Sequence, residues 1–275
     1  MISFAFIVSS LTLTTFIPVY AALYLVSALR LRPRYLAAFG VGLVFWYFYD
    51  TLAEAASLGV NNALYPTYLF GGIPHLALIG AFVAGVVFIA AVDHVSVPAT
   101  GPAPGRKALF LIPAVVALVM GVHGLGEGWG AVSAVSSSPT AGSDLQGLVQ
   151  AFGTFPALAS YPIHKFLEAS IVAIIYTVYL KGEGADAAWW EVPLLGILFA
   201  GPSAIGAALG YYYSFDTTYF FAFGVTAALY AMVRMVEPIA RSPRDASVAP
   251  AHYGFRVLLA IGLGMLVLYT AALLH

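Results

Sequence analysis

The chain has 275 residues, of which 61% are hydrophobic and only 8% are charged, with a formal net charge of −1. A soluble domain carries about 25% charged residues, so this composition excludes a water-soluble globule, and it is opposite to that of a disordered chain. The absence of cysteine excludes disulfides and thiolate ligands, and the charge balance leaves no basic surface for nucleic acid.

Eight apolar segments follow one another along the chain, and each is long enough to cross about 30 Å of hydrocarbon as a helix. No segment shows the short alternating pattern of a β-barrel strand. We therefore predict an all-α integral membrane protein with one transmembrane domain over residues 1–275 and eight spans. These are Ser3–Leu29, Tyr35–Gly59, Gly71–Val92, Ala108–Ala134, Thr154–Leu180, Ala188–Tyr211, Thr217–Val236 and Tyr253–Leu274. The first segment has no positive charge before it, so it is interpreted as a span and not as a removable signal.

The basic residues predict the orientation of these spans. Ten of the eleven lie in or beside the first, third, fifth and seventh connections, whereas the second, fourth and sixth contain none. The positive-inside rule therefore places the odd connections in the cytoplasm and both termini outside. The compact chain suits an inner membrane of a prokaryotic cell. The exception is Lys165, which lies near the middle of the fifth span, where a cation is costly and usually functional.

Histidines and acids inside the spans occur at a regular spacing. His123 and Glu127 on the fourth span are four residues apart, and so are His164 and Glu168 on the fifth. Residues four apart share one helix face, and consecutive spans are antiparallel, so the two pairs can meet at a similar depth. Two imidazoles and two carboxylates are sufficient ligands for a divalent metal. The other interpretation of each residue is a structural hydrogen bond between helices.

Three further polar residues are candidates for a pathway. Asp50 and Glu54 on the second span could form a metal entrance, accept a proton or pair with Lys165. His75 begins the third span at the outer surface, where it is a candidate peripheral ligand or a surface residue with no role.

These motifs resemble the ZIP (Zrt/Irt-like protein) family of divalent metal transporters. His123-Gly-Leu-Gly-Glu127-Gly128 resembles the fourth-helix motif of that family, and His164-Lys-Phe-Leu-Glu168 resembles its fifth-helix motif. Weaker similarities occur in the sixth and seventh spans. The resemblance implies eight helices arranged as three, two and three, with the outer triplets related by an inverted repeat. It also makes a homodimer plausible.

Three positions depart from the family pattern at the place where some members hold a second metal. Gly124 replaces an Asn or Asp, Lys165 replaces a second acidic ligand, and Gly201 replaces a sixth-helix glutamate. We therefore expect one metal, with Lys165 in place of the second. The expected function is transport of a divalent transition metal, with zinc favoured and iron, manganese, cobalt and cadmium also allowed by the ligands.

Two other functions use the same residues. An intramembrane metalloenzyme would hold zinc with an open position for water and a glutamate as base, although few other polar residues are present for a substrate. A retinal Schiff base on Lys165 would make a coloured protein, but the span count and the lysine position differ from those of familiar pigments. The main prediction remains a transporter and not an enzyme.

Overall fold

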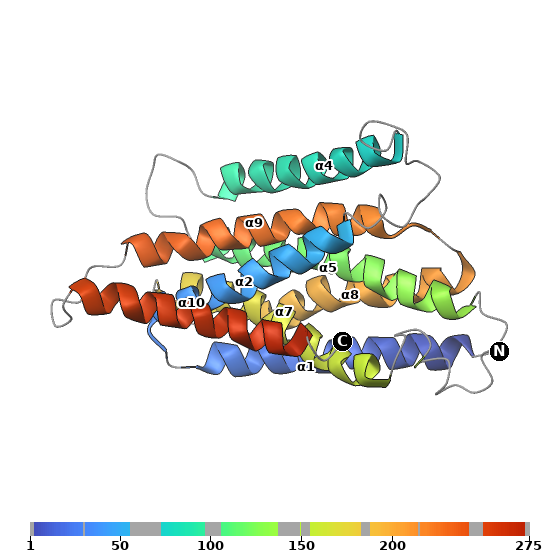
Figure 1. Ribbon diagram of the computed structural model, residues 1–275, viewed down its shortest axis with the longest axis horizontal. Helices are drawn as coiled ribbons and strands as arrows, with labels where there is room; N and C mark the ends of the chain where they lie inside the picture. The colour runs from blue at the N-terminus through green and yellow to red at the C-terminus, as the bar shows by residue number, and fades with distance from the viewer. Residues whose placement is uncertain are drawn as a thin grey trace.

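The computed structural model describes residues 3–29, 31–55, 73–96, 106–136, 149, 155–182, 188–213, 215–241 and 250–272. These residues form eight long helices, one for each predicted span, and no strand occurs among them. The helices are α1 (Phe4–Ala28), α2 (Pro33–Ala55), α4 (Ile73–Ser96), α5 (Arg106–Ser136), α7 (Phe155–Gly182), α8 (Glu191–Tyr212), α9 (Thr218–Arg241) and α10 (Pro250–Ala272). The helices run roughly along the long axis of the molecule (Figure 1).

The lengths and composition of the helices confirm an all-α, multi-pass membrane protein. Within the described residues, seven helices contain an apolar stretch long enough to cross a bilayer, and α10 contains a shorter one, Phe255–Val267. The predicted second span extended to Gly59, but its last four residues lie outside the described part of the chain. Large apolar side chains such as Ile17 and Leu258 are exposed, as expected where the neighbour is lipid and not water.

The two helices that carry the His-x-x-x-Glu pairs are the most buried spans of the bundle. Val116, Met120, Ile171 and Ile175 of α5 and α7 are almost fully buried in the main hydrophobic core. In contrast, α4 lies at the edge of the bundle beside α9 (Figure 1). The central position of α5 and α7 buries most of their length inside the bundle.

The helix contacts follow an internal symmetry. The helices can be matched in four pairs: α1 with α8, α2 with α9, α4 with α10, and α5 with α7. If the two members of every pair are exchanged, nearly every two helices in substantial contact are replaced by two others that are also in contact. For example, the contact of α1 with α7 becomes that of α8 with α5, and the contact of α2 with α10 becomes that of α9 with α4. The matched helices of the outer triplets are five spans apart, and α5 and α7 are one span apart, so the members of every matched pair cross the membrane in opposite directions. An inverted repeat of the outer triplets, as expected from the sequence resemblance, would produce such a contact pattern.

Glycines allow α5 and α8 to approach each other closely. A Cβ atom on Gly128 of α5 would clash with the carbonyl oxygen of Ser203, and one on Gly206 of α8 would clash with that of Leu125. Close approach through small residues is typical of membrane helices, because tight van der Waals packing replaces the hydrophobic drive that lipid removes. The glycine-rich sequence around His123 therefore serves at least in part to seat α5 against α8.

Two groups of ion pairs lie at one end of the bundle. Arg106 at the start of α5 binds Glu191 at the start of α8, and Arg234 near the end of α9 pairs with Asp93 at the end of α4. The last turns of α7 join the two groups, because Tyr176 donates to Glu191 and Tyr179 donates to the Arg234 carbonyl. We call this the basic end; it is the end that the positive-inside rule predicts to be cytoplasmic.

Candidate metal centre

The two His-x-x-x-Glu pairs face each other in the middle of the bundle. His123 and Glu127 lie on α5, His164 and Glu168 lie on α7, and the two helices are in contact. Each pair stays on one face because four residues make about one helical turn. Pro162 lies inside α7 just before His164, and the helix nevertheless continues from Phe155 to Gly182.

One oxygen of each glutamate approaches the imidazole nitrogens. His123 Nε2 lies 3.4 Å from Glu127 Oε1 and 3.6 Å from Glu168 Oε1. His164 Nε2 lies 3.1 Å from Glu168 Oε1 and 4.0 Å from Glu127 Oε1. Each imidazole therefore faces both carboxylates, across the helix pair as well as along it.

These separations match the spacing of ligands around one metal ion. Nitrogen and oxygen ligands about 2.1 Å from a tetrahedral ion lie about 3.4 Å from one another. Among the described residues, His123, Glu127 and Glu168 offer donor atoms that all lie within 4.8 Å of each other. His164 approaches the two carboxylates but falls outside this mutual group.

Lys165 occupies the other side of the two carboxylates. Its Nζ pairs with Oε2 of Glu127 and donates to Oε2 of Glu168 at 2.5 Å, and it lies over the Tyr161 ring at 5.5 Å. The structure thus gives this lysine two partners on α5 and α7, and it does not support the expectation of a pair with Asp50. Lys165 is only 1% exposed, and a buried ammonium needs such counter-charges.

The two glutamates therefore divide the site into a side that faces the ammonium and a side that faces the imidazoles. Each carboxylate presents one oxygen to the ammonium and the other to the imidazole pair. With neutral imidazoles, the two glutamates and the lysine sum to a charge of −1. This leaves negative charge on the imidazole side, where a dication would be stabilised.

The four proposed ligands differ in exposure. The side chains of His164 and Glu127 are 14% and 15% exposed, whereas those of His123 and Glu168 are 3% and 1% exposed. Because α5 starts at the basic end and α7 finishes there, His164 and Glu127 are the pair farther from that end. Toward the basic end, Met120 and Ile171 continue into the packed core. The more exposed ligands thus lie on the side of the cluster away from the basic end.

Aromatic side chains from α2 and α9 form walls that the sequence pattern did not indicate. The His123 ring meets Tyr47 edge-on at 5.5 Å and Phe221 at 4.9 Å. Gly224 lies against it, because a Cβ there would be 2.7 Å from the His123 Cβ. The only sequence signal for Tyr47 was its position three residues before Asp50 on the same helix, which is not specific.

The remaining expected residues have different outcomes. Asp50 interacts electrostatically with all four proposed ligands, so α2 presents it toward the site. A Cβ on Gly124 would lie 3.9 Å from Glu127 Oε2, so this glycine borders the site and leaves room beside the carboxylate. Gly201 is different, because the nearest neighbour of a Cβ there is Ile197 on its own helix. Glu54 and His75 lie in α2 and α4, but their side chains are outside the described part of the structure.

The comparisons with known proteins return no relative. No protein-family model matches the chain, and neither a curated protein nor a solved structure does. The protein is therefore classified here by its fold and its site alone: a multi-pass helical membrane protein with a buried His/Glu cluster that has the arrangement of a metal-binding group.

Proposed function

We propose that this protein carries a divalent transition metal across the membrane, as a divergent relative of the ZIP family. His123, Glu127, His164 and Glu168 bind the ion, and Lys165 takes the place of a second metal. The observation that carries the proposal is the convergence of two imidazole nitrogens and two carboxylate oxygens at 3.1–4.0 Å in the middle of a membrane bundle.

The donor set fits zinc and its neighbours. Two neutral nitrogens and two carboxylate oxygens suit zinc, iron or manganese, and they disfavour a soft ion such as Cu(I), which prefers sulfur. A cluster with only a structural role would lower the stability of the protein. Each of the two carboxylates in a low-dielectric interior costs several kcal/mol unless cations neutralise it. Lys165 supplies one positive charge, and a bound dication would more than offset the charge of −1 that remains.

The uneven burial of the cluster supports transport over simple storage. His164 and Glu127, farther from the basic end, are the more exposed ligands, and packed side chains follow the cluster toward that end. A carrier exposes a central site first to one side of the membrane and then to the other. The repeat-like contact pattern of the outer helices is also typical of transporters, whose inverted repeats provide the two states.

The test is metal uptake into proteoliposomes that contain an internal zinc indicator. We expect saturable zinc flux in the wild type and a loss of more than about tenfold in His123→Ala and in the double variant Glu127→Ala/Glu168→Ala, since even outer partners of metal ligands are worth 10–100-fold. His94→Ala is the matched control, because His94 is an exposed residue near the end of α4. Competition with iron, manganese, cobalt and cadmium ranks the ions.

Other outcomes would favour a different function for the protein. Tight binding without flux would favour the intramembrane enzyme, in which a metal-bound water is the reactive group. Flux that His123→Ala leaves unchanged would exclude the proposed ligands. If metal neither binds nor crosses, the two His-x-x-x-Glu pairs are structural.

A further inference from the structure

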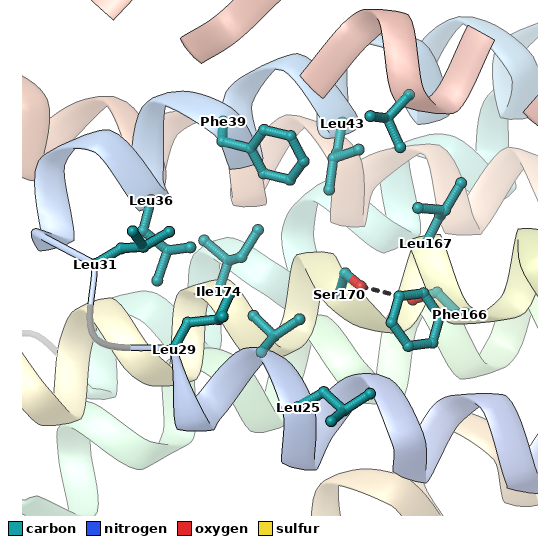
Figure 2. Close-up of a pocket in the computed structure, with 12 residues that line it drawn as sticks. Leu25, Leu29, Leu31, Leu36, Phe39, Leu43, Phe166, Leu167, Ser170 and Ile174 are labelled. Atoms are coloured by element: carbon teal, nitrogen blue, oxygen red, sulfur yellow. Dashed lines mark hydrogen bonds between the residues drawn. The ribbon is translucent and has the colours of Figure 1, made fainter. Parts of the chain in front are cut away.

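A groove lies between α1, α2, α7 and α10 (Figure 2). Its volume is about 430 Å³. Leu25 and Leu29 of α1, Leu36 and Phe39 of α2, and Leu167 and Ile174 of α7 are among the side chains that line it. We call it the flank groove.

The lining is apolar almost throughout. The one polar side chain among the described lining residues, Ser170, donates its hydroxyl to the Phe166 carbonyl of its own helix at 2.7 Å. The hydroxyl is thereby used within α7 and needs no external partner. An occupant of this groove is therefore a hydrocarbon and not a polar molecule.

The groove opens sideways, toward the bilayer. Leu25, Leu29 and Leu31 on its rim are 61%, 44% and 56% exposed. In a membrane-spanning bundle, such an opening in this flank faces acyl chains. Burial of a chain in the groove gains packing contacts on several sides, whereas a flat helix surface offers contacts on one side only.

An exposed arginine follows the groove lining along the chain. The connection from α1 to α2 reads Leu29-Arg30-Leu31-Arg32-Pro33-Arg34 and contains no acid. Leu29 and Leu31 line the groove, so Arg32 directly follows a lining residue, and its side chain is exposed. Arg34 is buried, with its guanidinium over the Tyr35 ring at 4.9 Å.

We propose that the flank groove is a binding site for an anionic phospholipid, with one acyl chain in the groove and the phosphate at Arg32 of the α1–α2 connection. The apolar lining selects the chain, and the exposed arginine beside it selects the headgroup. Anionic lipids are attracted to basic residues next to a span by about 1 kcal/mol per residue.

Helix α7, which carries half of the proposed metal centre, forms the floor of the groove. Phe166, Ser170 and Ile174 recur every four residues on one face of α7, while His164 and Glu168 recur on another. A lipid seated there contacts α7 directly behind the ligands. The lipid site does not depend on the metal, so the two proposals succeed or fail separately.

The test is lipid titration of the purified full-length protein, followed by native mass spectrometry. Phosphatidylglycerol and phosphatidylcholine with identical chains are compared, and inorganic phosphate is added in a third arm. We expect phosphatidylglycerol to bind several-fold more tightly than phosphatidylcholine, and inorganic phosphate not to compete. Arg32→Gln should weaken phosphatidylglycerol binding about fivefold, corresponding to about 1 kcal/mol, and leave phosphatidylcholine unchanged. Arg256→Gln, an exposed arginine near the start of α10, is the control.

A second pair of variants tests the chain pocket. Leu25→Trp fills the groove from its exposed rim, and it should weaken both lipids. Leu13→Trp is the matched control, because Leu13 lies on the same helix, is 57% exposed and does not line the groove. Equal binding of the two lipids, or equal effects of the two tryptophans, would overturn the proposal and leave ordinary solvation by lipid. Competition by inorganic phosphate would show an anion site without a lipid site.

Discussion

Lys165 determines how the two glutamates are used. Its ammonium holds one oxygen of Glu127 and one of Glu168, and it leaves the other oxygen of each for the imidazoles. Its positive charge is part of the chain, so it stays beside the two buried carboxylates. Lys165 is therefore the residue that organises the cluster.

Removal of this ammonium should expose its role. Lys165→Met leaves two buried carboxylates without their cation, and breaking a buried ion pair in this way costs roughly 3–5 kcal/mol. We expect a lower thermal midpoint in the absence of metal, and a larger rise on addition of zinc than in the wild type, because the released oxygens can bind a second ion.

The measurement combines thermal unfolding in detergent with metal analysis of the purified protein. The bound zinc should increase from one ion toward two per chain in Lys165→Met. Lys165→Arg keeps the charge and is the control, so it should stay at one ion. A methionine variant as stable as the wild type, with unchanged zinc content, would refute the assignment of Lys165 as a tethered cation.

Among the elements, the packing of α5 against α8 sets the position of His123 and Glu127. Gly128 and Gly206 lie at points where a side chain would meet a backbone carbonyl of the opposite helix. A backbone cannot move aside as a flexible side chain can, so the helices would have to separate. The position of His123 and Glu127 thus depends on glycines that are not part of the cluster.

Gly206→Ala is expected to lower stability by about 1–3 kcal/mol, the usual cost of overpacking, and to weaken zinc binding because α5 shifts. The control is Gly262→Ala on α10, where a Cβ would meet nothing within 4 Å. Alanine is the better helix former by up to about 1 kcal/mol, so this control should be neutral or stabilising. Thermal unfolding and zinc titration of both variants provide the comparison, and equal behaviour of the two alanines would contradict it.

At the scale of the whole molecule, the basic end and the more exposed ligands lie on opposite sides of the cluster. The ion pairs of Arg106 and Arg234 lie at one end, and His164 and Glu127 lie on the side of the cluster away from it. If the basic end is cytoplasmic, as the positive-inside rule predicts, these two ligands lie on the outer side. Under the proposed function, metal from the exterior would reach them first.

The natural absence of cysteine makes this orientation directly measurable. A single cysteine in Tyr213→Cys, at the end of α8, should react with a membrane-impermeant maleimide in intact cells. A cysteine in Leu31→Cys, beside the arginines, should react only after the membrane is opened. Both positions are well exposed, at 64% and 56%, and the unmodified protein serves as an unlabelled control. The reverse labelling pattern would invert the topology and the direction of the proposed uptake.

Much of this protein follows from its sequence alone. Composition determines that the chain is a membrane protein, because so few charges cannot keep a folded surface in water. The length of the apolar segments determines that it is helical, since each crosses the bilayer with its backbone bonds satisfied internally. The spacing of His123 from Glu127 and of His164 from Glu168 places each pair on one face, because it matches the helical period.

Only the tertiary structure decided how these pairs meet. The helical period does not determine which oxygen of a carboxylate faces which neighbour. The division of Glu127 and Glu168 between Lys165 and the imidazoles is therefore decided by the packing of the helices. The same holds for Tyr47 and Phe221, which reach His123 from helices far away in the sequence. The flank groove likewise forms where four helices leave a space between them. A local sequence pattern cannot predict a space between segments that are distant in the chain.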